Sequence, residues 1–273
     1  MNAPADNIRP EKVAVVGIPF DANSSFMRGA ARAPGHIRTA IESGASTLCS
    51  ESGVDLAERS DFIDLGDMRI NSESDALGNI EARVSDILTR DIRLIALGGD
   101  HSITYPILRS FHKKFGQLEI FHLDAHPDLY DSYDGNRFSH ACPFARIMEE
   151  KLATRLVQIG VRALNPHQIQ QAERFGVEMI TIPQFEKAAR MQLEGPLYLS
   201  IDLDVLDPAF APGVAHHEPG GLTTRQVIEL IQQLQAPIVG ADIVELNPQR
   251  DPLSMTAMVA VKILKEVAVR MLA

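Results

Sequence analysis

The stretch LEIFHLDAHPD, residues 118–128, holds the main clue to the fold of this chain. Its first half is apolar, as in a buried strand, but it then runs into two histidines and two aspartates, and Pro127 interrupts any regular ladder. Ionised aspartates are rarely buried unless they are paired or bind a metal. The pattern therefore predicts a core strand that ends at a polar, chemically active cluster.

Seven other short apolar runs also predict strands. They are rich in β-branched residues and continuous rather than alternating, which is typical of parallel strands buried on both faces. The eight expected strands cover residues 13–18, 62–66, 93–99, 118–124, 155–160, 177–182, 197–204 and 237–245. Helices are expected near residues 34–43, 75–90, 102–115, 143–151, 166–175, 223–235 and 254–272. This alternation predicts a three-layer α/β/α sandwich around a mainly parallel sheet of eight strands.

Composition narrows the class of protein. The chain has 273 residues, of which 45% are hydrophobic, and shows no linker or repeat, so we expect a single domain over 1–273 with a flexible extension at 1–10. The formal charge of −10 disfavours nucleic acid as a partner but allows a small cation. Two distant cysteines and the absence of a long apolar run predict a cytoplasmic protein without a membrane partner.

Four of the expected strands end in polar motifs: GGDHS at 98–102, DAHPD at 124–128, DLDVLDP at 202–208 and VELNP at 244–248. In open parallel sheets, ligands bind outside the carboxyl ends of the strands, so these motifs are expected to meet at one edge. The candidate metal ligands are His101, Asp124, His126, Asp128, Asp202 and Asp204.

The charge of this group predicts its ligand. Four converging carboxylates would repel one another, and two divalent cations would balance them. Oxygen-rich ligands with a minority of imidazole suit Mn²⁺ better than Zn²⁺, and two such ions can share a hydroxide. Taken singly, each motif could instead be a helix cap or a turn. Asp100 is expected to orient His101 or cap the next helix, Asp207 to form a turn, and His122 to be a hydrogen-bonded core histidine.

Longer strings make the motifs recognisable. The chain resembles the ureohydrolase family of arginases and agmatinases, closest to its plant-type branch, from about Val13 to the C-terminus. The resemblance rests on NSSF (23–26), GGDHSITYP (98–106), HLDAHPDLYD (122–131), SIDLDVLDPAFAPG (200–213), SHACPFARIMEE (139–150), HHEPGGL (216–222), NPQRD (247–251) and MTAMVAVK (255–262).

The resemblance implies an arginase-like fold and two Mn²⁺ ions per subunit. One ion would be held by His101, Asp124, Asp128 and Asp202, and the other by Asp124, His126, Asp202 and Asp204. It implies hydrolysis of a small cationic guanidino substrate to urea and an amine, as in polyamine or arginine metabolism. It also implies a homotrimer or homohexamer.

The resemblance assigns three catalytic residues: Glu245, which holds the guanidinium; His140, a proton shuttle to the leaving amine; and Asp128. His140 stands in HAC rather than the commoner HG. The further substrate-binding candidates are Tyr130, Asn165 and Glu218, of which Glu218 could instead support the EPGG turn.

The substrate stays open between agmatine and L-arginine. Ala163 and Asn165 stand where animal arginases place acidic residues. Guanidinobutyrate, formimidoylglutamate and a non-catalytic metal-binding paralogue are the alternatives.

Overall fold

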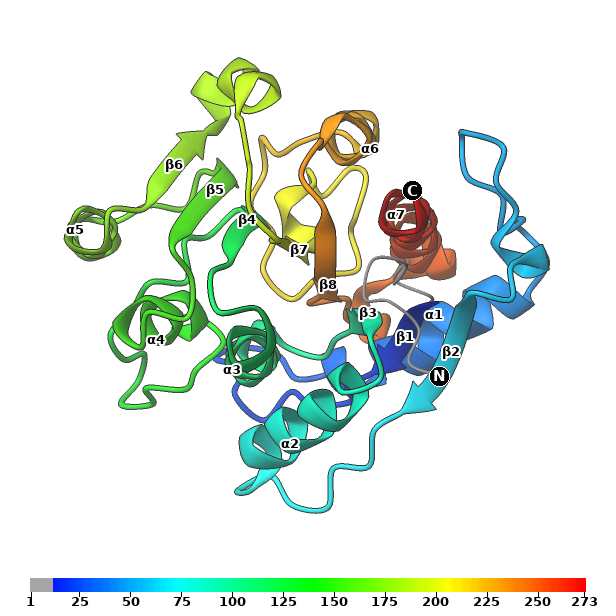
Figure 1. The fold of residues 1–273 in the computed structure, drawn as a ribbon. Helices are drawn as coiled ribbons and strands as arrows, with labels where there is room; N and C mark the ends of the chain where they lie inside the picture. The colour runs from blue at the N-terminus through cyan, green and yellow to red at the C-terminus, as the bar shows by residue number, and fades with distance from the viewer. Residues whose placement is uncertain (1–11) are drawn as a thin grey trace.

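The computed structural model describes residues 12–273 and centres on one eight-stranded sheet in which all neighbouring strands run parallel (Figure 1). The α/β class is confirmed, and the sheet is wholly rather than mainly parallel. The strands are β1 Lys12–Gly17, β2 Phe62–Asp67, β3 Ile92–Leu97, β4 Glu119–Leu123, β5 Arg155–Val161, β6 Glu178–Thr181, β7 Leu197–Asp202 and β8 Ile238–Val244.

Helices cover both faces of this sheet, which confirms the predicted three-layer sandwich (Figure 1). One layer is made of α2 Ala76–Leu88, α3 Thr104–Phe115, α4 Pro143–Glu149 and α5 Pro166–Phe175. The other is made of α1 Ala33–Glu42, α6 Thr224–Gln233 and α7 Met255–Leu272. Over residues 12–273, no helix is both long and apolar enough to cross a membrane.

The inner strands are mostly apolar on both faces because each face forms its own core, whereas the edge strands β2 and β6 are partly exposed. On β4, Phe121 and Leu123 pack in the core beneath α1, α6 and α7, whereas Ile120 packs in the core beneath α2, α3 and α4. Side chains alternate along a strand, so His122 points to the same side as Ile120. The continuous apolar runs in the sequence follow from this double burial.

The strand order brings the polar motifs together. The order is β2-β1-β3-β8-β7-β4-β5-β6, which puts β3, β8, β7 and β4 side by side in the middle of the sheet. These four strands are the ones that end in the polar motifs. Because all of them run parallel, their carboxyl ends meet at one edge, and Glu245 contacts His101 although the two are 144 positions apart.

Element boundaries differ from the sequence predictions at the site itself. The helix expected from residue 102 begins with the 3₁₀ turn η4 His101–Ile103, and the strand expected to reach residue 204 ends at Asp202, where η6 Leu203–Val205 begins. Both turns are capped by an aspartate, because Asp100 Oδ1 accepts from Ser102 N at 3.1 Å and Asp202 Oδ1 accepts from Asp204 N at 2.8 Å.

Two further segments bear on the sequence predictions, one after β6 and one at the N-terminus. The 3₁₀ segment η5 Ile182–Arg190 was not predicted. The extension expected at residues 1–10 lies outside the described residues.

A close backbone approach at Gly99 lets β3 end beside its neighbours. The Gly99 carbonyl accepts a hydrogen bond from Glu245 N at 3.0 Å. A Cβ atom on Gly99 would lie 1.6 Å from the carbonyl oxygen of Phe20. Only glycine fits this position, so the loop after β3 depends on the missing side chain.

Replacing Gly99 by alanine should lower the free energy of unfolding by at least about 1–3 kcal/mol, because the backbone must move to admit the methyl group. Chemical denaturation measures the change. Gly78→Ala is the matched control, because nothing lies within 4 Å of a Cβ there and the residue is in helix α2, so it should leave stability equal or raise it. Equal stability of Gly99→Ala and the wild type would contradict this account of the loop.

Candidate metal centre

All six predicted metal ligands lie at the carboxyl edge of the sheet: Asp202 is the last residue of β7, and the other five stand on the tight turns that follow β3, β4 and β7. Short side-chain to backbone bonds shape these turns; Asp124 Oδ1, for example, accepts from His126 N at 2.6 Å. Asp128 has φ of 50°, in the left-handed region that non-glycine residues seldom adopt. Such backbone strain tends to persist at functional sites, where the surrounding contacts enforce it.

The first group of ligands surrounds the fully buried imidazole of His101. Its Nδ1 lies 3.2 Å from Asp124 Oδ2, 3.1 Å from Asp128 Oδ2 and 3.3 Å from Asp202 Oδ2. Within residues 12–273 this nitrogen has no hydrogen-bond partner. Buried polar atoms rarely lack a partner, and one imidazole nitrogen among three carboxylate oxygens fits a divalent cation.

The second group is centred on His126 and is more open to solvent. His126 Nδ1 lies 2.9 Å from Asp204 Oδ2 and 3.4 Å from Asp124 Oδ1, and its side chain is 27% exposed. Asp124 therefore directs Oδ2 towards His101 and Oδ1 towards His126. This is the arrangement that a carboxylate would need in order to bridge two cations.

The electrostatics of the cluster call for positive charge. Burial, together with the charges of Asp204 and Asp124, raises the pKa of Asp202 well above its usual value. Burial and the neighbouring Asp124 raise the pKa of Asp204 to about 6. Burial lowers the pKa of His126, but the carboxylates of Asp204 and Asp124 together outweigh burial and raise that pKa strongly. Protons thus balance the carboxylates where no cation does, which is the behaviour expected of an acidic metal site.

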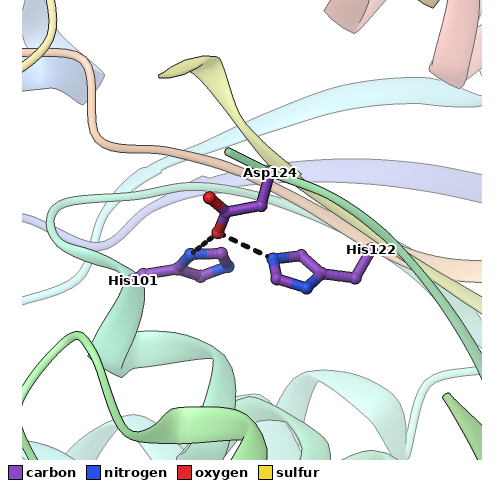
Figure 2. Close-up of side chains that lie close together, drawn as sticks. All are labelled: His101, His122 and Asp124. Carbon is purple, nitrogen blue, oxygen red and sulfur yellow. Dashed lines mark hydrogen bonds and ion pairs between the residues drawn. The ribbon is translucent and has the colours of Figure 1, made fainter. Parts of the chain in front are cut away.

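His122 lies beside His101 and Asp124 (Figure 2), and both of its ring nitrogens have a hydrogen-bond partner. Its Nε2 lies 2.8 Å from Asp124 Oδ2, and its Nδ1 lies 3.0 Å from Gln158 Nε2. The ring is completely buried and stacks on Phe144 with 3.9 Å between centroids. The prediction of a hydrogen-bonded core histidine is therefore confirmed, and His122 orients the ligand Asp124.

Asp100 was expected either to orient His101 or to cap the following turn. Its side chain caps the turn through Ser102 N, and its Oδ2 accepts from Asn23 N at 3.0 Å. No hydrogen bond between the Asp100 side chain and the His101 ring is found among the described residues. Asp207 forms the expected turn, because its carboxylate accepts from the amides of Ala209 and Gly220.

Glu245 and His140 form a pair next to the cluster. Glu245 has φ of 67°, and its Oε1 accepts from His101 N and from His140 Nδ1, both at 2.8 Å. The other ring nitrogen, Nε2, accepts from Ser25 N at 3.2 Å and lies 2.8 Å from Ser25 Oγ. The Ser25 amide can only donate, so this geometry is that of a neutral ring with its proton on Nδ1.

The charge of Glu245 also acts on the proton affinity of His140. Burial lowers the pKa of His140, but the Glu245 carboxylate more than offsets this and raises it to about 9. The high pKa and the Ser25 contact conflict, because a second proton on Nε2 would displace the Ser25 amide. The hydrogen bonds of the structure are those of a neutral His140 ring. The raised pKa means that the ring would bind an added proton tightly.

A cavity of about 390 Å³ opens onto these groups, and its wall includes His126, Asp128, Asp202, Asp204, His140 and Glu245. The predicted substrate residues Tyr130 and Asn165 also line it. Asn165 Nδ2 donates to Tyr130 Oη, and Asn165 Oδ1 accepts from Gln168 N at 3.0 Å, so both groups are held in place. Four of the six predicted metal ligands therefore share one cavity with Tyr130 and Asn165, whereas His101 and Asp124 lie behind its wall and are not among the lining residues.

Glu218 is not among the residues that line this cavity. Its main-chain carbonyl accepts from Arg162 Nε at 2.9 Å and from Arg162 Nη2 at 2.6 Å. This favours the structural alternative for Glu218, in which it helps to form the turn at EPGG.

Several residues of the cavity wall were not predicted as site residues, and Ser25, Arg162 and His216 are among them. The His216 ring lies 5.3 Å from that of His140 and 5.9 Å from that of His126, measured between centroids. Ser25 and His216 belong to the strings NSSF and HHEPGGL that carried the family resemblance, which was the available signal. Arg162 directly follows β5 and stands next to Ala163, in the stretch VRALNPHQ that was compared with animal arginases, but it was not itself predicted as a site residue.

Residues 11–269 match the sequence description of one family, the arginase family. The chain belongs to the arginase family. It is 44% identical over 276 residues to "Arginase 1, mitochondrial" of Arabidopsis thaliana, an alignment covering 94% of this chain and 80% of the relative. It is 35% identical to "Guanidino acid hydrolase, mitochondrial" of Homo sapiens, over 93% of this chain and 76% of that protein.

Solved structures of arginase-family proteins share the fold. The arginase from Medicago truncatula superposes with a TM-score of 0.91 at 39% identity, covering 96% of this chain and 88% of that one. The agmatine ureohydrolase of Thermoplasma volcanium gives 0.84 at 32% identity, covering 98% and 93%. The expected arginase-like fold is confirmed, and so is the expected enzyme class: the chain is an amidine hydrolase of the ureohydrolase type.

The expected cytoplasmic location was wrong. The names of the plant relatives from Arabidopsis thaliana and Oryza sativa give them a mitochondrial or a chloroplastic and mitochondrial location. The arginase-family relatives therefore point to an organelle. The expectation had rested on composition and on two distant cysteines. These features indicate a reducing environment but do not distinguish the cytoplasm from an organelle.

Asp124→Asn should abolish binding of divalent metal, because it removes charge from the one carboxylate that faces both histidines. Metal content after dialysis, measured by plasma mass spectrometry, tests this. Asp207→Asn is the matched control: it also changes an aspartate next to β7, but one that only forms a turn, and it should keep the metal content of the wild type. Full metal content in Asp124→Asn would contradict the assignment.

Proposed function

We propose that this arginase-family enzyme hydrolyses the guanidino group of L-arginine to urea and L-ornithine at a centre of two Mn²⁺ ions. The observation that carries the proposal is a single cavity whose wall includes three carboxylates of the acidic cluster, Asp128, Asp202 and Asp204, and also Glu245. A carboxylate-rich metal site supplies an activated water, and a further carboxylate can hold a planar cation. Both are needed to hydrolyse a guanidinium.

The two groups of ligands correspond to two cation sites. His101, Asp124, Asp128 and Asp202 would hold one ion, and Asp124, His126, Asp202 and Asp204 the other. Oxygen donors with a minority of imidazole favour a hard or borderline ion such as Mn²⁺ over thiolate-seeking Zn²⁺. Bound there, a pair of such ions would supply a water that is activated for attack at neutral pH.

Glu245 would bind and orient the substrate guanidinium. Its Oε1 already accepts two hydrogen bonds, from His101 N and His140 Nδ1, which fixes the direction of the carboxylate. Among the described residues, no hydrogen bond to Oε2 is found, so this oxygen is the one available to a guanidinium N–H. A charge-assisted bond from a guanidinium to a carboxylate is short and strong, and the burial of Glu245 strengthens it further.

His140 would supply the proton that the leaving amine needs. Its ring lines the cavity beside Glu245, and the charge of Glu245 stabilises an added proton on the imidazole. Nδ1 is hydrogen-bonded to Glu245, and Nε2 contacts the amide and hydroxyl of Ser25, so Nε2 is the nitrogen that would gain and release the transferred proton. Asp128, whose Oδ2 lies 3.1 Å from His101 Nδ1, is proposed both as a ligand and as a group that can accept a proton from the attacking water.

The choice of L-arginine rests on the relatives. Six plant arginases match 94% of this chain at 41–44% identity. Agmatine is the second candidate, because Ala163 and Asn165 in the cavity wall offer no carboxylate to an α-ammonium group, and a solved agmatine ureohydrolase shares the fold.

Urea release after loading with Mn²⁺ tests the proposed function. L-Arginine, agmatine, guanidinobutyrate and formimidoylglutamate are compared at equal concentration, with a chelated sample as the blank. We expect urea from L-arginine at the highest kcat/KM, and none after chelation. Urea from agmatine alone would move the assignment to the second candidate, and no urea from any guanidino compound would overturn the proposal.

Glu245→Gln should lower kcat/KM by at least about 10–100-fold, as expected for losing a buried hydrogen bond to a charged group worth about 1.5–3 kcal/mol. The metal content should stay unchanged, since Glu245 is not a ligand. Glu218→Gln is the matched control and should change kcat/KM little, because Glu218 does not line the cavity. Equal losses in the two variants would argue against a direct contact between Glu245 and the substrate.

A further inference from the structure

A second layer of polar side chains lies in the sheet directly beneath the metal ligands. His122, Ser200 and Asp242 are paired in register across β4, β7 and β8, and each lies two positions or fewer before its strand ends. All three are completely buried. Their neighbours on this face belong to the core beneath α3 and α4, so any partner of these polar atoms has to come from the protein.

Asp242 is the acceptor at the centre of this layer. Its Oδ1 accepts from Ser200 Oγ at 2.7 Å, and its Oδ2 accepts from Tyr198 Oη at 2.7 Å and from Thr104 Oγ1 at 2.8 Å. No lysine, arginine or histidine in the described part of the chain forms an ion pair with it. Three hydroxyl hydrogens therefore stabilise this buried carboxylate.

This pattern determines where the proton of His101 lies. A serine hydroxyl has one hydrogen, and Ser200 gives it to Asp242 because a carboxylate has none to return. Ser200 Oγ also lies 3.0 Å from His101 Nε2, so towards His101 it can only accept. The proton of the neutral ring therefore sits on Nε2, and Nδ1 directs a lone pair at the three carboxylates.

Such a lone pair is unfavourable unless a cation is bound. Without a constraint, the neutral ring would place its proton on Nδ1, where Asp124, Asp128 and Asp202 would accept it. That tautomer would block the nitrogen that a metal needs. The hydrogen bonds of Ser200 instead select the tautomer with the proton on Nε2, because the Ser200 oxygen accepts from that nitrogen.

We propose that Asp242 is a positioning residue of the metal centre: acting through Ser200, it holds the proton of His101 on Nε2 and keeps Nδ1 open as a metal ligand. This inference rests on the proposed function in one respect, namely that the His101 cluster binds metal. Asp242 does not line the cavity and, within residues 12–273, its side chain forms no hydrogen bond to a candidate metal ligand; its effect passes through the Ser200 hydroxyl.

Asp242→Asn separates this role from simple packing, because the two side chains have the same shape. The hydroxyls of Tyr198 and Thr104 still need an acceptor, so the amide oxygen stays with them and Nδ2 turns to Ser200. Ser200 then accepts from Asn, and its hydrogen turns to His101 Nε2. The proton of His101 moves to Nδ1, which is the nitrogen that faces the carboxylates.

Two readouts test the change in the full-length chain. Nitrogen-15 NMR of histidine-labelled, metal-free protein should show the proton of the neutral His101 ring on Nε2 in the wild type and on Nδ1 in Asp242→Asn. The spectra are recorded at a pH above the pKa of His101, because burial lowers that pKa but Asp124, Asp128 and Asp202 outweigh burial and raise it well above its usual value. Titration with Mn²⁺, followed by the EPR signal of the free ion, should show that Asp242→Asn weakens the affinity of the tighter site about 10–100-fold. This is the usual cost of changing a residue that supports a metal ligand through hydrogen bonds. Tyr198→Phe, which removes a hydroxyl from Oδ2 only, is the matched control and should keep both the tautomer and the affinity of the wild type.

The proposal is overturned if Asp242→Asn keeps the Nε2 proton and wild-type Mn²⁺ affinity, or if Tyr198→Phe loses as much affinity as Asp242→Asn. A wild-type chain that binds no Mn²⁺ contradicts the proposed function instead, while the NMR tautomer still decides this inference. If Asp242→Asn does not fold, Ser200→Ala gives the same test, because it removes the acceptor at Nε2 and should move the His101 proton to Nδ1.

Discussion

The repulsion among four buried carboxylates is the constraint on which the rest of the molecule depends. Asp124, Asp128 and Asp202 all lie within 3.3 Å of His101 Nδ1, and Asp204 lies 2.9 Å from His126 Nδ1, so four carboxylates converge at one edge of the sheet. Carboxylates gathered in this way cannot all be ionised without nearby positive charge. The raised pKa values of Asp202 and Asp204 express this cost. A site that gathers so much negative charge in a buried place is stable in its ionised form only when cations occupy it.

The fold brings these groups together by placing β3, β8, β7 and β4 side by side. Their carboxyl ends meet, and tight turns capped by aspartates turn the side chains inward. Gly99 allows the backbone to approach closely, and Asp128 and Glu245 accept left-handed backbone conformations. One layer below, the hydrogen bonds of His122, Ser200 and Asp242 orient the ligands. The site is thus built from rigid strand ends rather than from flexible loops, which suits a metal centre.

Much of this arrangement could be predicted from the sequence. The strands were recognisable because parallel strands buried on both faces are apolar throughout, and the ligands because aspartates and histidines at strand ends contradict that pattern. His122 was predicted to be a hydrogen-bonded core histidine from its position inside β4, and its hydrogen bonds confirm this. The 3₁₀ turns were missed because a single capping aspartate shortens or delays an element without changing its hydrophobic pattern.

Other features could not be predicted, since they depend on contacts between distant segments. Ser200 and Asp242 look like ordinary polar residues in two strands until the register pairs them and brings His101 to Ser200. The loop residue Ser25 reaches His140 across 115 positions. Glu218 looked equally suited to a substrate contact and to a turn, and only its place outside the cavity wall favours the turn.

The central claim is that this edge of the sheet holds a pair of divalent cations. A crystal structure of the Mn²⁺-loaded enzyme, with anomalous data collected at the manganese edge, tests it most directly. The account predicts two anomalous peaks about 3.5–4 Å apart, one next to His101 Nδ1 and the other next to His126 Nδ1, with Asp124 between them. A single peak, or none at these two nitrogens, would contradict it.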